Sequence, residues 1–290
     1  VLKEKKAMLN LEMERLQKGI LFCYFEDPDT IQHMFWRYRD PQHPLYEKDA
    51  PLEYKEMIEA WYLKMDIVVG DVLNKMNEDD MLIVLSDHGF NTFRRAVHVN
   101  SWLRKNGYFV LKDSELKSGR ELFEDVDWSK TKAYSIGFGG IYINQMGRES
   151  EGIVKPGKET EELKKEITEK IQQWRDDKYK TSVINTVYAK EEIFCGPHTK
   201  DAPELFLGFS IGYRSSWQTA IGGCPEQLLE DNLKKWSGDH LFDPKLIPGI
   251  LFTNFEVNTN QPSIYDLTPT ILNLVGYSDE EIREFDFDGK

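Results

Sequence analysis

Three short segments of the 290-residue sequence place aspartate close to histidine, and these residue types bind transition-metal ions. The first segment runs from Asp29 to His33. On a helix, positions i and i+4 share a face, so this pair can bind one ion together. A second interpretation stays open, in which Asp29 stabilises a helix N-terminus by its charge and His33 lies on the surface.

The other two segments are Asp87-His88-Gly89 and Gly238-Asp239-His240. The first follows an apolar run directly and is expected at the C-terminal end of a buried strand, where ligands bind in open α/β sheets. A plain turn with a charged tip is the alternative. His240 lies in a polar loop, where a structural role is the alternative, and Asp243 is near enough in sequence to orient it.

Together the segments supply a ligand set of two carboxylates and three imidazoles: Asp29, His33, Asp87, His88 and His240. That set suits two divalent metal ions of the zinc type, with manganese as an alternative. Two such ions a few ångströms apart can clamp a phosphoryl group between an attacking and a leaving oxygen. We assign no site role to the remaining histidines, which are His43, His98 and His198.

Two continuous apolar runs, residues 20–25 and 81–85, precede the first two segments and suit strands that are buried on both faces. Helical periodicity follows each start signal over residues 27–38 and 52–76. The order strand, helix, helix, strand is typical of an α/β sheet. We therefore predict a mainly parallel sheet flanked by helices on both faces, with both Asp/His pairs at one edge of the sheet.

Length and composition fit a single α/β domain over residues 1–290, with an inserted region at about 111–203. The net charge of −13 disfavours nucleic acid and anionic membranes as partners. A small phosphate ester remains compatible with this net charge, because a bound cation reverses the local field.

The three cysteines form no CxxC pair, so neither a thiolate zinc site nor a disulfide framework is expected. No apolar run approaches the ~20 residues that span a bilayer and no signal peptide is visible, so we expect a cytoplasmic protein without a membrane segment.

Three motifs occur in order along the chain: Tyr24–His33, Ser86–Phe90, and Ser237–His240 followed by Ile247–Leu251. These motifs resemble the metal-binding motifs of the type I phosphodiesterase/nucleotide pyrophosphatase family, within the alkaline phosphatase superfamily. Two further stretches look like a bacterial branch of that family, described as predicted phosphohydrolases and phosphomutases: Phe93–Leu103 and Tyr265–Thr270.

The resemblance implies an alkaline phosphatase-like fold and hydrolysis of small phosphate esters, as a phosphodiesterase or nucleotide pyrophosphatase, at a two-metal site. By the same resemblance Asp29, His33 and His240 bind one ion, and Asp87 and His88 bind the other. A phosphomutase of the same superfamily and a non-catalytic metal-binding module remain as alternatives. The Cys/Ser-x-Pro-x-Arg motif of a sulfatase does not occur in the sequence.

The family pattern also includes a Ser or Thr nucleophile and a further metal-binding Asp near its N-terminus. Residues 1–28 contain no Ser or Thr, and Asp27 is their only Asp. The chain begins without Met, inside a segment that has the pattern of a helix. We therefore predict an N-terminally truncated chain that lacks the first strand of its fold. We expect no catalytic residue in this chain, a nucleophile upstream of Val1, and an inactive fragment.

Overall fold

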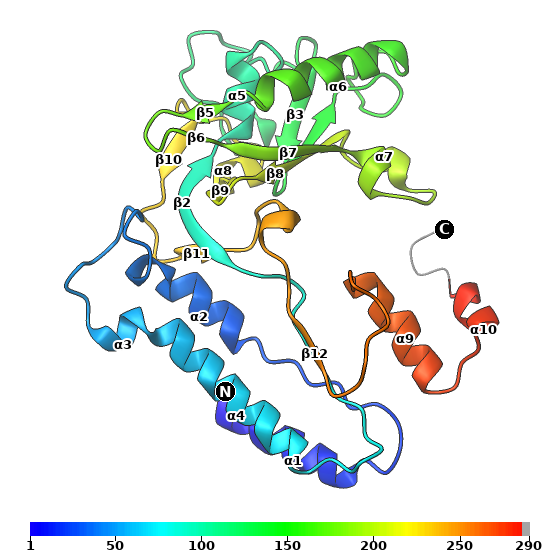
Figure 1. Cartoon of the computed structure of the whole chain (residues 1–290). Helices are drawn as coiled ribbons and strands as arrows, with labels where there is room; N and C mark the ends of the chain where they lie inside the picture. Colours follow the sequence, from blue (N-terminus) through cyan, green and yellow to red (C-terminus); the bar gives the residue numbers. More distant parts are fainter. Residues whose placement is uncertain (286–290) are drawn as a thin grey trace.

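The computed structural model describes residues 1–285, with helices packed at one end of the molecule and a β-rich body at the other (Figure 1). The α-helices are α1 (Leu2–Arg15), α2 (Asp27–Phe35), α3 (Leu52–Lys55), α4 (Met57–Leu73), α5 (Val99–Lys105), α6 (Lys158–Ile171), α7 (Lys190–Ile193), α8 (Trp217–Ala220), α9 (Leu267–Leu274) and α10 (Asp279–Glu284). The strands are β1 (Ile83–Leu85), β2 (Asn91–Val97), β3 (Ala133–Ile136), β4 (Gly140–Ile143), β5 (Arg175–Asp176), β6 (Thr181–Ser182), β7 (Ile184–Ala189), β8 (Leu205–Phe209), β9 (Gly212–Ser215), β10 (Leu229–Asp231), β11 (Gly238–Asp239) and β12 (Leu251–Thr253). Short 3-10 helices span Trp36–Tyr38, Glu121–Phe123, Thr199–Asp201, Pro244–Leu246 and Ile264–Asp266.

The helix α2 begins at Asp27 and carries Pro28 in its first turn, as the sequence predicts. Proline suits this position because its fixed φ is helical and an N–H would have no partner there. A 3-10 turn extends the helix to Tyr38, and α2 packs against α4. The helix expected over residues 52–76 forms as α3 and α4, which are separated at Glu56.

The strands pair mostly antiparallel, so the mainly parallel sheet expected from the sequence is wrong. Among the strands named above, only β2 and β9 pair parallel. The strands β10 and β11 pair antiparallel with β2, and β3, β4, β8 and β7 form an antiparallel sheet. Antiparallel strands can be joined by a tight turn, but parallel strands need a crossover of about a dozen residues. The turn between β3 and β4 shows this, because Gly137 and Gly139 have φ values of 76° and 141° that let the chain reverse there.

The apolar run at residues 20–25 is not a strand, which is a second correction. Ile20 and Phe22 are 53% and 79% exposed, and within residues 1–285 no strand pairs with this segment. An apolar run forms a buried strand only where neighbours supply backbone hydrogen bonds and cover both faces. The other expected strand forms as β1, but it is only partly buried and pairs antiparallel with β12.

The main hydrophobic core lies in the β-rich body, where the β3-β4-β8-β7 sheet meets α5 and α6. The helix α6 contributes Leu163, Ile167 and Ile171, whose spacing of four residues forms one buried stripe. Each such side chain stabilises the fold by roughly 1.5–3 kcal/mol when it is fully buried. The same core includes Val97 at the end of β2, so the body anchors the strand that leads to the candidate site.

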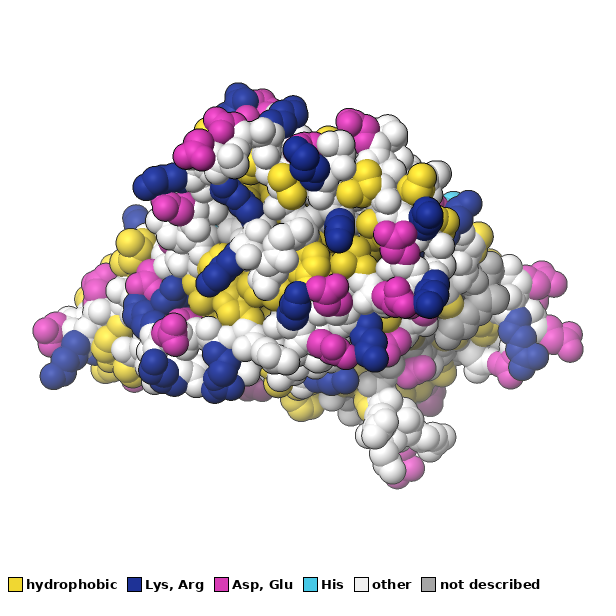
Figure 2. All heavy atoms as spheres, turned by 90° about the horizontal axis from the view of Figure 1, so that it is seen from above, with side chains coloured by type: hydrophobic (Ala, Val, Ile, Leu, Met, Phe, Trp, Pro, Cys, Tyr) yellow, Lys and Arg dark blue, Asp and Glu magenta, His cyan; other side chains and the backbone are white. Residues whose placement is uncertain are grey.

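The surface of the body is charged. The face seen from above carries Lys and Arg interspersed with Asp and Glu (Figure 2).

The inserted region expected at about 111–203 supplies β3 to β7 together with α6 and α7. Its status as an insertion in a single domain stays a prediction, as does the absence of a first strand of the fold. Within residues 1–285, no helix is both long enough and apolar enough to cross a bilayer. The cytoplasmic location also stays a prediction.

Candidate metal centre

Asp29 and His33 lie one turn apart on α2, as their spacing predicts. His33 Nε2 is 3.4 Å from Asp29 Oδ2. His33 is only 2% exposed, because Trp236 stacks on its ring with 3.5 Å between centroids and Phe90 meets it edge-on. The alternative of a surface position for His33 is therefore excluded.

A backbone carbonyl orients the His33 ring. His33 Nδ1 lies 2.8 Å from Gly238 O, and because a carbonyl oxygen only accepts, the Nδ1 proton is the one donated. In the neutral ring, Nε2 then keeps its lone pair and faces Asp29. A ring N–H that donates to a carbonyl is the usual arrangement behind a metal-binding histidine.

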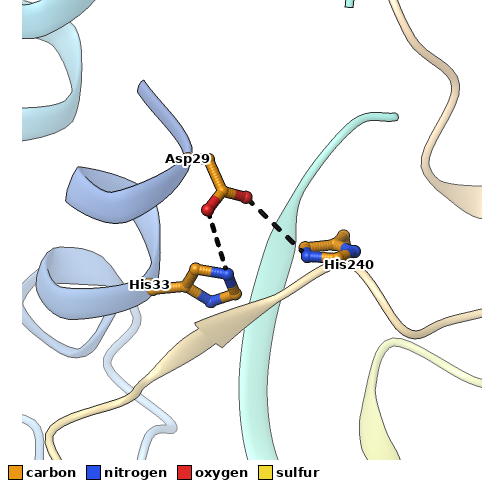
Figure 3. Close-up of side chains that lie close together, drawn as sticks. All are labelled: Asp29, His33 and His240. Atoms are coloured by element: carbon orange, nitrogen blue, oxygen red, sulfur yellow. Dashed lines mark ion pairs between the residues drawn. The ribbon is translucent and has the colours of Figure 1, made fainter. Parts of the chain in front are cut away.

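His240 reaches the same place from the chain segment that follows β11 (Figure 3). Its Nε2 lies 3.7 Å from Asp29 Oδ1. This segment is tied to α2, because the Ser237 N–H donates to the His33 carbonyl oxygen at 2.6 Å. It is also tied to β2, because β11 pairs with the start of that strand. Two backbone connections therefore hold His33 and His240 beside each other.

Asp87 and His88 lie in the loop between β1 and β2. The His88 ring stacks on His240 with 3.7 Å between centroids and an interplanar angle of 14°. His88 Nε2 is 3.9 Å from Asp29 Oδ1 and 3.5 Å from Asp87 Oδ2, and the Asp87 side chain is 69% exposed. The structure thus brings all five residues singled out in the sequence together, with Asp29 facing the three histidines.

The scaffold that achieves this is a loop contact and not the shared edge of a parallel sheet. Gly89 N donates to Ile247 O at 2.8 Å. A Cβ at Gly89 would lie 2.5 Å from Pro248 O, closer than real side chains approach. The absence of a side chain at Gly89 therefore lets the loop with Asp87 and His88 pack against the segment that leads into β12.

His33 and His240 favour their neutral form. Burial lowers the pKa of His33, and this outweighs the opposite effects of the Gly238 carbonyl and Asp29. Burial, followed by the nearby His88, lowers the pKa of His240. At neutral pH both rings are therefore uncharged, which is the form whose nitrogen binds a metal ion.

Asp29 Oδ1 is the atom that tests whether a cation fits. It is buried and accepts no hydrogen bond from the described residues, and an unpaired buried acceptor costs about 1–3 kcal/mol, or more when charged. The ligand atoms of Asp29, His33 and His240 all lie within 4.8 Å of one another. A divalent cation among them would supply the missing partner, and mixed carboxylate and imidazole donors suit zinc.

Sequence reasoning missed Trp236 and assigned the wrong carboxylate to His240. Asp243 accepts hydrogen bonds from Asn185 at 2.7 Å and from Tyr188 at 2.8 Å, and none from His240, so its expected role is wrong. Asp239 instead accepts the backbone N–H of His240 at 2.8 Å. The available signal was adjacency, since Asp239 lies inside the Gly-Asp-His segment itself.

Comparison with known proteins finds a family that matches most of the chain. The model of the type I phosphodiesterase/nucleotide pyrophosphatase family matches residues 2–223. No curated protein matches the chain. Among solved structures, human ectonucleotide pyrophosphatase/phosphodiesterase 5 is 16% identical with a TM-score of 0.47, and its murine counterpart is 17% identical with a TM-score of 0.48. Each comparison covers 96% of this chain and 60% of the neighbour, so the chain spans less than two thirds of either neighbour.

Proposed function

Because the chain belongs to the type I phosphodiesterase/nucleotide pyrophosphatase family, we propose that its Asp/His cluster is a metal centre for the hydrolysis of phosphate esters. The observation that carries this proposal is the buried, unpaired Oδ1 of Asp29, which faces His88 and His240. Two divalent ions are proposed, with zinc as the first choice and manganese as the second. Asp29, His33 and His240 hold one ion, and Asp87 and His88 contribute to the other.

The chain's own residues act by binding and orienting. His33 presents Nε2 because Gly238 accepts its Nδ1 proton, and stacking keeps the His88 and His240 rings nearly parallel. Bound ions of this kind supply positive charge to a phosphoryl group and its leaving oxygen. That charge also matters for substrate capture, because the chain carries a net charge of −13 that would otherwise repel a phosphate ester.

The five residues of the cluster do not include a hydroxyl or thiol, so they do not supply the Ser or Thr nucleophile of the family pattern. We therefore propose that the 290-residue chain binds metal and phosphate but turns over phosphate esters slowly, if at all.

Metal titration of the purified chain tests the centre directly. We expect Co²⁺ to give the visible absorption of a nitrogen- and oxygen-bound site, and Zn²⁺ to displace it. Loss of a residue that hydrogen-bonds to a metal ligand typically lowers metal affinity by about 10- to 100-fold. His33→Ala removes a proposed ligand itself and should lower Co²⁺ affinity at least as much. His198→Ala is the matched control, because the side chain of His198 is 91% exposed and lies outside the cluster.

Phosphate binding and turnover complete the test. Inorganic phosphate should bind to the metal-loaded chain and not to the metal-free chain or to His33→Ala. Equal Co²⁺ affinities for the wild-type chain and His33→Ala would refute the metal centre. Turnover of bis(p-nitrophenyl) phosphate that disappears in His33→Ala would instead refute the proposed inactivity and leave the centre standing.

A further inference from the structure

A buried ion pair lies directly behind the candidate metal centre. Arg214 in β9 and Asp239 in β11 are each 1% exposed, and Arg214 Nη1 lies 2.5 Å from Asp239 Oδ2. The guanidinium stacks near Trp217, at 4.1 Å from the ring centroid, and Phe93, at 4.9 Å. Removing two charges from water is costly, and well-packed apolar residues often serve stability equally well. A contribution to stability alone therefore does not explain why this ion pair is buried here.

The Asp239 carboxylate is connected to two histidines of the cluster, His33 and His240. Its Oδ1 accepts the backbone N–H of His240 at 2.8 Å and that of Leu241 at 3.0 Å. Its Oδ2 accepts the Trp236 Nε1–H at 2.9 Å. The Trp236 ring stacks on His33 at 3.5 Å between centroids with an interplanar angle of 27°. One carboxylate thus fixes the backbone at one histidine and the ring packed on the other.

We propose that Arg214 is a positioning residue of this centre: by holding Asp239 it keeps Trp236 against His33 and sets the backbone of His240. The ligand role of the two histidines rests on the proposed function, whereas the positioning itself is a property of the metal-free chain. Arg214 touches no ligand atom and acts only through its neighbours.

The geometry favours arginine over lysine at this position. Arg214 Nε donates to Ser215 O at 3.0 Å while Nη1 contacts Asp239, so a planar fork bridges two acceptors. Its Nη2 is buried and has no hydrogen-bond partner among the described residues. A native fold that retains an unpaired buried donor needs an explanation, and the orientation of the metal ligands supplies one.

The test replaces both charges at once, because removing one would leave the other buried and unpaired. In Arg214→Met/Asp239→Asn the amide oxygen can still accept the His240 N–H, but the contact to Arg214 and the hydrogen bond from the Trp236 Nε1–H, both made to Oδ2, are lost. The matched control is Arg148→Met/Glu204→Gln, a second Arg/Glu pair with 2.9 Å between Arg148 Nη2 and Glu204 Oε2, in which Glu204 is buried and Arg148 is partly buried; it lies outside the cluster.

Two readouts separate positioning from simple stability. The first is Co²⁺ affinity, which should fall about tenfold or more in the Arg214/Asp239 variant, as for loss of other outer partners. The second is the set of histidine ring NMR signals in the metal-free chain, where His33 should lose the ring-current shift caused by Trp236. The control pair should lower the melting temperature without changing either readout. Wild-type Co²⁺ affinity and wild-type ring signals in the Arg214/Asp239 variant would overturn the proposal.

Milder variants keep the test decisive if the double variant does not fold. Arg214→Lys keeps the charge and loses the fork, and Trp236→Phe keeps a stacked ring and loses the N–H to Asp239. Trp236→Phe changes the stacked ring itself and serves as a reference for the size of the shift, so Arg214→Lys decides: it should shift the His33 ring signals, and unchanged signals in Arg214→Lys would overturn the proposal. If the wild-type chain binds no Co²⁺, the proposed function fails, while the ring signals of the metal-free variants still decide the positioning role.

Discussion

At the scale of single residues, Asp29 carries a cost that a bound cation would remove. Its Oδ1 is buried without a hydrogen bond, beside histidines that burial keeps neutral. In Asp29→Asn the amide N–H groups could donate to those ring nitrogens, and the negative charge beside them would disappear. We expect the metal-free variant to melt at or above the wild-type temperature, while its Co²⁺ affinity falls at least tenfold.

Two measurements check these expectations. Thermal denaturation in the presence of a chelator gives the melting temperature of the metal-free chain, and Co²⁺ titration gives the metal affinity. The control is Asp66→Asn on the exposed face of α4, which removes the same charge away from the cluster. It should change neither the melting temperature nor the affinity appreciably. A lower melting temperature together with unchanged Co²⁺ affinity in Asp29→Asn would show that Asp29 serves the fold and not a metal ion.

The residues of the cluster were predictable because metal chemistry restricts the choice of side chain. Asp29 and His33 share a helix face by spacing alone, and Asp87 and His88 directly follow an apolar run. Arg214 was not predictable, because its link to Asp239 depends on two strands that each pair with β2. Nothing in the spacing of residues along the chain indicates that pairing.

At the scale of secondary-structure elements, the contact between β11 and α2 determines where the histidines lie. A Cβ on Gly238 would lie 2.5 Å from Gln32 O, 2.9 Å from Phe90 Cε1 and 3.0 Å from Trp36 Cβ. Gly238→Ala must therefore push β11 away from α2, and the His33 contact to the Gly238 carbonyl lengthens. We expect a loss of about 1–3 kcal/mol in the free energy of unfolding, as for other overpacked sites, together with weaker Co²⁺ binding.

Gly70→Ala is the matched control for this change, because nothing lies within 4 Å of a Cβ at Gly70 in α4. There the substitution should stabilise the chain by about 0.5–1 kcal/mol, since alanine favours a helix interior. Urea denaturation measures both variants. A Gly238→Ala chain as stable as the wild type would mean that β11 and α2 are not in close contact.

The helices were easier to predict than the strand pairing for a physical reason. An amphipathic helix such as α6 satisfies its own backbone and shows its buried stripe in the local sequence. A strand needs a partner that lies elsewhere in the chain, so the apolar run at residues 20–25 carries no information about what pairs with it. The antiparallel pairing of β1 with β12 was hidden for the same reason.

At the scale of the whole molecule, two effects of acid oppose each other. Protonation reduces the net charge of −13 and with it the self-repulsion of the compact state. Buried neutral histidines have the opposite effect and destabilise the folded state in acid, because they bind protons more readily in the unfolded chain than in the folded chain. Most carboxylates titrate near pH 4, so the histidines should dominate the change in stability above that pH.

His43 is the histidine for which this effect is best defined. Its side chain is buried, Nε2 donates to Phe93 O at 2.9 Å and Nδ1 accepts the Leu45 N–H at 3.0 Å, and burial lowers its pKa to about 4. In the unfolded chain the pKa of a histidine is about 6.5. Between pH 6.5 and 4 the unfolded state therefore binds a proton at His43 that the folded state does not bind. As the pH decreases through this window, His43 lowers the free energy of unfolding by up to about 1.4 kcal/mol per pH unit. Urea denaturation of the metal-free chain across that window should show a flatter pH dependence for His43→Gln and an unchanged one for the exposed His198→Gln. Parallel pH profiles for His43→Gln and the wild type would mean that His43 titrates alike in the folded and unfolded chain.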